Sequence, residues 1–547
     1  MQSRFKLTLL LAVITALFFS SCSSKTNKEG RYVPLNAVFV LHINGQSINS
    51  KLPWEEIKQN ELFKEAYADS STSALMRSVL DNPENTGIDV KNDILQFVVN
   101  DSTGGYMAVE GSLKDAAKFK QFTAEASKNL AVETEKNGIH FLSTDKMTAA
   151  WNKEKFVYVV NAHMFGRRSR NYSAEKDLNA IATQIFDLKE KGSLGADEKF
   201  SGLVGTTGDI HFWFNIEAMN ISAEDLPRNM GPLAMIDLKK MYEGTRLTGT
   251  VNFENGKISA DFKSYASKEM TEILKKYSGD KLSSDMLKRI PSNNLAGFFA
   301  LNFKPEGIRE YLKMLGLEGF ANMGERMLGF NLDDFIKANK GDILVAVTDI
   351  SKDSSGKPDA SVIFSASIGD KQSFNKLVEA GKKLFDQNMG DFGPTFFYNM
   401  NENYFAIGNK KPEVDKYIST ANNSNPAILD KISGSAGAAY INIQYLMKSV
   451  GPGKDSLDIA TYNASIKIWD DVVAYGTGFK DGGSTQHLEI NLLDKNTNSL
   501  KQMNAYMGEM GVIQKKRKEQ YRSYYDMDKD KIDSTMKMID SLKQQLH

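Results

Sequence analysis

The sequence has almost no cysteine: Cys22 is the single one among 547 residues. A chain with one thiol cannot form an intramolecular disulfide, so its fold must depend on a hydrophobic core. Histidine is also scarce, with 6 residues, and no two of them have the spacing of a zinc finger or of a helical metal site. We therefore predict no metal-binding residue and no cofactor.

Net charge and long apolar runs are lacking as well. The 68 basic residues balance the 68 acidic ones, and a chain without a basic excess does not indicate a nucleic-acid partner. The apolar run from Leu7 to Phe19 is shorter than the roughly 20 residues that span a bilayer, and no later run approaches that length. We therefore expect no transmembrane helix.

The short apolar run has the features of an export signal. Two basic residues precede it, and Ser20-Ser21-Cys22 follows it, which is typical of a bacterial lipoprotein cleavage site. We predict a signal peptide over residues 1–21, lipidation of Cys22 and a polar tether over residues 22–30. A plain secretory cleavage and an uncleaved anchor are the alternatives.

The rest of the chain contains landmarks that occur twice in the same order. Val33-Pro34-Leu35-Asn36 leads into an alternating apolar run typical of a strand, and Ile290-Pro291-Ser292-Asn293 leads into another. Farther along, Lys199-Phe200-Ser201-Gly202 matches Lys431-Ile432-Ser433-Gly434. This repetition indicates an internal duplication.

Two further landmarks fix the register of the proposed copies. Phe214-Asn215-Ile216 matches Ile441-Asn442-Ile443. The Asn255-Gly256 pair matches Asp481-Gly482, and both pairs are typical of a two-residue hairpin turn, which requires positive φ. Each copy should therefore contain the same hairpin in the same place.

These patterns predict an α+β fold made of two tandem copies of a mainly antiparallel sheet-and-helix domain, over residues 31–288 and 289–510. Residues 511–547 are predicted to form a C-terminal helical extension, because their apolar residues recur at helical spacing. This helix would either pack on its own domain or bind a partner.

Motifs for catalysis are weak. Ser173, Ser278 and Ser373 each precede a lysine by three positions, the spacing of a serine-lysine nucleophile pair, but none of the motifs that normally complete such a site follows. Asp526-Met527-Asp528 resembles the start of a calcium loop, but Lys531 replaces the turn glycine. We therefore assign no catalytic residue.

The Cys22 motif, the Val-Pro-Leu-Asn opening and the duplicated body together resemble an uncharacterised lipoprotein family of Bacteroidota, a domain-of-unknown-function family. The resemblance covers nearly the whole mature chain and brings no activity or site residues. It implies a cell-envelope setting in which exported proteins are O-glycosylated at Asp-Ser/Thr motifs. The candidate glycosylation sites are Ser102, Ser456, Ser534 and Ser541.

The leading hypothesis is a lipid-anchored cell-envelope protein that binds or scaffolds a partner without catalysis. The tether lacks an acidic run behind Cys22, which favours the periplasm-facing side of the outer membrane, while surface exposure stays open. The alternatives are an envelope hydrolase whose site is assembled by the fold and a carrier of an apolar ligand. A ligand or protein partner would bind in the cleft between the copies or on the C-terminal helix.

Overall fold

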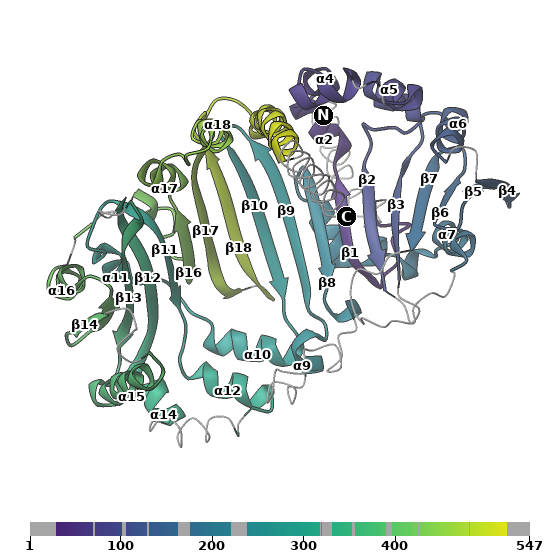
Figure 1. Cartoon of the computed structure of the whole chain (residues 1–547). Coiled ribbons are helices and arrows are strands. Elements are labelled where there is room, and N and C mark those ends of the chain that lie inside the picture. The colour runs from purple at the N-terminus through teal and green to yellow at the C-terminus, as the bar shows by residue number, and fades with distance from the viewer. Residues whose placement is uncertain are drawn as a thin grey trace, which may run out of the picture.

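The computed structural model describes most of the chain between residues 29 and 521. The gaps in this range are residues 69, 71, 101–104, 128–130, 162–175, 220–237, 318, 320–330, 353–355, 390–395, 422, 425–426 and 481. Within the described residues the strands form one 18-stranded sheet, with helices along its faces and edges (Figure 1). The fold is a mixed α+β fold with a large antiparallel sheet.

Ten strands make up the first part of the sheet: β1 (Ala37–Ile43), β2 (Ile94–Val99), β3 (Tyr106–Ser112), β4 (Val132–Lys136), β5 (Ile139–Ser143), β6 (Met147–Trp151), β7 (Lys155–Asn161), β8 (Ile210–Asn215), β9 (Arg246–Glu254) and β10 (Lys257–Tyr265). Their spatial order is β4-β5-β6-β7-β3-β2-β1-β8-β9-β10, and every neighbouring pair is antiparallel.

The other eight strands continue the same sheet: β11 (Leu295–Asn302), β12 (Asn339–Lys352), β13 (Pro358–Ile368), β14 (Phe397–Met400), β15 (Tyr404–Gly408), β16 (Gly437–Ile441), β17 (Trp469–Lys480) and β18 (Gly483–Leu492). Their spatial order is β18-β17-β16-β11-β12-β13-β15-β14.

The two parts join where β10 pairs with β18, from Lys257 opposite Asn491 to Ser264 opposite Ser484. The hairpins β9–β10 and β17–β18 therefore lie next to each other in the middle of the sheet (Figure 1). Gly256 and Gly482 in their turns have φ of 69° and 78°, which confirms the two hairpin predictions, because glycine adopts positive φ without strain.

The helices before β11 are α2 (Gly45–Lys51), α3 (Trp54–Ile57), α4 (Glu61–Ala68), α5 (Ala74–Asp81), α6 (Ala116–Ala126), α7 (Leu178–Phe186), α8 (Glu198–Val204), α9 (Leu238–Tyr242), α10 (Lys268–Tyr277) and α11 (Ser284–Lys288). Those after it are α12 (Gly307–Met314), α14 (Leu332–Ala338), α15 (Lys371–Met389), α16 (Lys411–Ser419), α17 (Ile443–Val450) and α18 (Ser456–Ser465). Residues 499–521 are helical.

One face of the sheet, here called the helix-covered face, holds the two main cores. Phe97 and Trp213 are buried with residues of α7 and α8 in the first core. Phe298 and Leu344 are buried with residues of α11 and α16 in the second. Burial of this apolar area is the main stabilising contribution to the fold.

The opposite face, here called the open face, is covered mainly at its two ends. Phe119 of α6 packs on Trp151 at one end, and Phe374 of α15 packs on Ile368 at the other. Farther in, Phe299 is 48% exposed. Between its covered ends this face therefore presents the large apolar side chain of Phe299 to solvent.

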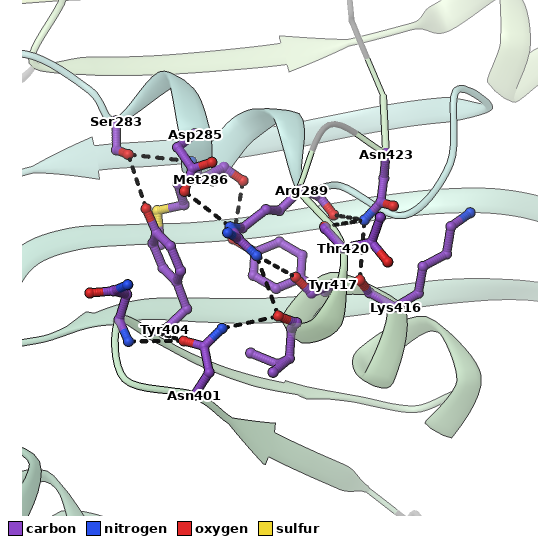
Figure 2. Close-up of polar contacts among 12 residues, drawn as sticks. Ser283, Asp285, Met286, Arg289, Asn401, Tyr404, Lys416, Tyr417, Thr420 and Asn423 are labelled. Atoms are coloured by element: carbon purple, nitrogen blue, oxygen red, sulfur yellow. Dashed lines mark hydrogen bonds and ion pairs between the residues drawn. The ribbon is translucent and has the colours of Figure 1, made fainter.

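Arg289 connects α11 to the last turn of α16. Its Nε lies 3.0 Å from Asp285 Oδ2, and its Nη1 donates to the carbonyl oxygens of Tyr417 and Ile418 at 3.3 Å and 3.4 Å (Figure 2). The guanidinium also lies 4.8 Å from the ring centroid of Tyr404. Carbonyls at a helix C-terminus lack intrahelical partners, so a cation is favoured there.

No helix among the described residues is both long enough and apolar enough to cross a membrane. Residues 522–547 lie outside the described range. The C-terminal helical extension therefore stays a prediction.

Candidate functional site

Four of the five predicted modification sites lie outside the described part of the chain: Cys22, Ser102, Ser534 and Ser541. Ser456 is described and is exposed at the first position of α18. Asp455, just before it, is the N-cap of that helix and accepts from the backbone N–H groups of Leu457 and Asp458. The lipidation and glycosylation predictions stay predictions.

A row of polar side chains crosses the centre of the helix-covered face. Each member pairs with the next on the adjacent strand, in the order His42, His211, Thr250, Asp261, His487 and Tyr475. Asp261 and His487 face each other where β10 meets β18. The row therefore runs across the junction between the two parts of the sheet.

His42 and His211 form a buried, stacked pair with ring centroids 5.2 Å apart. Their Nδ1 atoms are 3.0 Å apart, and His211 Nε2 lies 3.1 Å from the Thr206 carbonyl oxygen. A carbonyl only accepts, so His211 Nε2 carries a proton, and its Nδ1 accepts from His42 while the ring is neutral. Burial, with a smaller contribution from His42, lowers the pKa of His211 and favours this neutral form.

His487 is in the opposite electrostatic situation. Its Nδ1 lies 2.7 Å from Asp261 Oδ1, and its Nε2 lies 2.9 Å from Glu489 Oε1. Burial acts to lower the pKa of His487, but the two carboxylates outweigh it and raise this pKa. The geometry therefore favours an imidazolium held between two carboxylates.

Glu489 also forms ion pairs with further cations at the junction. It is 4% exposed, and it forms an ion pair with Lys431 and a second one with Lys257, whose Nζ is 3.5 Å from Oε1. Burial acts to raise the pKa of Glu489, but the hydrogen bonds from Lys431 and His487 outweigh it and lower this pKa. The buried carboxylate is thus compensated, as a buried charge must be.

A hollow of about 620 Å³, here called the junction hollow, lies between α8 and strands β9, β10 and β18. Its lining consists of Glu198, Lys199, Gly202, Leu203, Thr206, Thr248, Gly249, Thr250, Asp261, Phe262, Lys263, Tyr265 and Thr485. Thr485 comes from β18 and the other residues precede it in α8, β9, β10 and the segment after α8. This size is ordinary for a small-molecule site.

Two lysines point their ammonium groups at one ring in the junction hollow. Lys199 Nζ lies 4.6 Å and Lys263 Nζ lies 5.2 Å from the centroid of Tyr265. Within the described part of the chain, neither ammonium has a carboxylate at ion-pair distance. The acidic residues in the lining of the hollow are Glu198 and Asp261, and both are exposed. Two ammonium groups beside threonine hydroxyls can hold an anionic group.

Sequence reasoning did not find this site. It recognised Lys199 only as part of a repeated landmark, and among the histidines it found no pair with the spacing of a metal site. Residues from distant strands become neighbours only through the register of the sheet, which one sequence does not reveal. An alignment of the proposed copies would have shown that Lys263 of the first copy stands where the second copy has an acid.

A family model described as a domain of unknown function, DUF4836, matches residues 31–407. No curated protein matches the chain. Among solved structures, crystal form I of TP0453 is 10% identical, covers 46% of this chain and 88% of its own, and has a TM-score of 0.24. Crystal form III is 8% identical, with coverages of 46% and 90% and a TM-score of 0.26.

Proposed function

The chain belongs to the DUF4836 family, whose function is unknown, and from this premise we propose that it is a ligand-binding protein of the cell envelope in Bacteroidota. A lipid on Cys22 would hold it at the periplasm-facing side of the outer membrane. The signal-like residues 1–21 and the lone thiol behind them support this anchor.

The anchor has a direct test in the natural host. The full chain should incorporate labelled fatty acid and partition into detergent, and Cys22→Ala should lose both properties. A label that persists in the variant would contradict the proposal. Intact-mass measurement of the same native protein tests the proposed O-glycans on Ser456 and the three other serines, since an unmodified polypeptide mass leaves no room for them.

We further propose that residues 31–288 and 289–510 are two copies of one domain, and the strand order supports this. β1 lies between β2 and β8 just as β11 lies between β12 and β16. β9 and β10 then follow β8 as β17 and β18 follow β16. Each copy would contribute its last strand to the junction.

Irregularities recur at matching places, which supports the duplication more strongly than the strand order does. β1 has a bulge between Ala37 and Phe39 where it pairs with β2, and β11 has one between Leu295 and Gly297 where it pairs with β12. A bulge is a local feature that must be specified by the sequence. Its recurrence is therefore expected of copies.

Capping residues recur in the same way. At the end of β8, the Asn215 side chain accepts from the Ala218 N–H at 3.0 Å. Just after β16, the Asn442 side chain accepts from the Tyr445 N–H at 2.9 Å. These are the two asparagines that the repeated landmarks pair with each other.

The observation that carries the ligand proposal is a difference between the copies. In the second copy, Lys431 forms an ion pair with the buried Glu489. The matching residues of the first copy are Lys199, by the repeated landmark, and Lys263, by the matching hairpin positions in β10 and β18. The acid is thus replaced by a second cation, and the hollow beside these two lysines is suited to an anionic ligand.

The other two functions considered from the sequence stand as follows. In the described part of the chain, the ring nitrogens of His42, His211 and His487 face carboxylates, a carbonyl oxygen or each other. These three histidines hold no described serine, so their contacts do not favour the hydrolase. An apolar carrier needs an apolar hollow, which lies elsewhere, beside α10 and α12.

Inorganic pyrophosphate, titrated calorimetrically into the full chain, tests the ligand class. Lys199→Met with Lys263→Met removes both charges and keeps the apolar stems. Because hydrogen bonds to charged groups contribute roughly 1.5–3 kcal/mol each, binding should weaken at least about tenfold. The matched control is Lys268→Met, an exposed lysine of α10 outside the hollow, which should bind like the original protein. Equal binding by all three proteins would contradict the proposal.

A further inference from the structure

A second hollow, here called the apolar pocket, has a volume of about 410 Å³ and lies under α10 and α12. These two helices lie side by side across the ends of neighbouring strands (Figure 1). The lining includes the rings of Tyr277, Phe299, Phe303, Tyr311 and Phe479. None of its residues belongs to the junction hollow.

The floor of the apolar pocket consists of small residues on adjacent strands. Phe299 of β11 lies opposite Ala439 of β16, which lies opposite Ala474 of β17. Gly437 and Gly476, also opposite each other, extend this floor. At these four positions on two adjacent strands, no side chain is larger than a methyl group. The sheet face is therefore open there.

The matching place in the first part of the sheet is filled. There Phe212 lies opposite Gly249, and Gly249 lies opposite Phe262. The two phenylalanine rings have centroids 5.4 Å apart, and a Cβ on Gly249 would meet the Phe212 ring at 2.0 Å. Where the first part has Phe212, the second has Ala439. The pocket therefore exists because a large ring is absent on one side only.

A glycine contact fixes the roof of the apolar pocket. A Cβ on Gly478 of β17 would meet the carbonyl oxygen of Gly279, just after α10, at 2.3 Å. The backbone that follows α10 thus lies directly on the sheet, closer than any side chain would allow. Fixed backbone thus borders the pocket on the α10 side.

The lining contains a single charged side chain, Lys304, whose Nζ lies 3.5 Å from Asp280 Oδ1 in an exposed ion pair. From Phe299 an apolar row leads out of the pocket, because Phe299 lies opposite Val345 and Val345 lies opposite Phe364. Phe299, Val345 and Phe364 are 48%, 37% and 37% exposed. An apolar pocket that continues into an apolar row, with one cation in its lining, suits a ligand with an apolar chain and an anionic end.

We propose that the apolar pocket binds a fatty acid, with the unbranched chain on Phe299, Ala439 and Ala474 and the carboxylate at Lys304. Burial of each methylene contributes about 0.8 kcal/mol, and the exposed ion pair of Lys304 leaves its ammonium accessible to a second carboxylate. The proposal rests on residues other than those of the junction hollow and holds whether or not the anion proposal does.

Calorimetric titration of the full chain with sodium dodecanoate below its micelle concentration tests this site. Dodecanoate should bind, and decanoate, with two methylenes fewer, should bind roughly tenfold more weakly. Ala439→Phe places in the pocket the ring that the first part of the sheet has, and it should weaken dodecanoate binding more than tenfold. Absence of binding, or unchanged binding by this variant, would overturn the proposal.

Three further variants separate the fatty-acid site from other effects. Ala474→Leu fills the same pocket if Ala439→Phe fails to fold. Val362→Ala changes an exposed apolar residue outside the pocket and should leave the dissociation constant unchanged. Lys304→Met should weaken the binding of dodecanoate but not that of dodecanol. Equal losses of affinity for both would contradict the placement of the carboxylate at Lys304. Pyrophosphate binding should survive Ala439→Phe, because the two hollows share no residue.

Discussion

At the scale of single residues, Glu110 of β3 is a buried carboxyl group with little compensation among the described residues. Its side chain is fully buried, and within the described part of the chain neither carboxylate oxygen has a hydrogen-bond partner, while Lys155 Nζ lies 3.9 Å from Oε2. Burial raises the pKa of Glu110 to about 7, against smaller opposing effects of Lys155 and Arg31. The folded protein therefore binds a proton more readily at this site than the unfolded chain does.

Glu110→Gln should consequently change how stability depends on pH. For an acid whose folded pKa is raised, stability decreases as pH rises from the unfolded pKa through the folded one. Glutamine carries no charge, so the variant should equal the original protein near pH 4.5 and exceed it by roughly 3 kcal/mol at pH 8.

Urea unfolding at several pH values measures this difference. The control is Glu243→Gln, an exposed acid, which should follow the original protein throughout. A constant difference between Glu110→Gln and the original protein from pH 5 to pH 8 would show that Glu110 ionises normally.

At the scale of elements, the contact of Gly478 with Gly279 determines how closely α10 and its following backbone approach β17. Gly478→Ala should destabilise the protein by about 1–3 kcal/mol, because the added carbon forces the backbone of residue 279 away from the sheet. The variant should also weaken dodecanoate binding, since the roof of the apolar pocket moves with that backbone.

The comparison variant for this contact is Gly381→Ala, in the middle of α15 with nothing within 4 Å of the added carbon. It should stabilise by roughly 0.5–1 kcal/mol, since alanine favours helix over glycine. Urea unfolding measures both changes. If Gly478→Ala were as stable as the original protein, the contact would not be the one that sets the helix position.

At the scale of the whole molecule, the sequence predicted local features well. The alternating apolar run after Val33-Pro34-Leu35-Asn36 identified β1, and the Asn-Gly pair at Asn255 identified the turn between β9 and β10. Both depend on neighbouring residues, so one sequence suffices. The α+β class with antiparallel sheets followed from the clustering of such strands.

What the sequence did not predict depends on long-range pairing. The separate sheets expected for two domains are one sheet, because β10 pairs with β18 across more than two hundred residues of chain. The neighbours of Lys199 and of His487 follow from that pairing. Register across distant strands is set by packing of the finished fold, which residue patterns do not encode locally.

The central claim is that the junction of the two proposed copies binds an anion between Lys199 and Lys263. Anomalous diffraction from crystals of the full chain soaked in sodium tungstate tests it most directly. The account predicts a tungsten peak in the junction hollow, within contact distance of both ammonium groups, and its loss in the Lys199→Met, Lys263→Met protein. Tungsten peaks elsewhere on the molecule with none in the hollow would contradict the account.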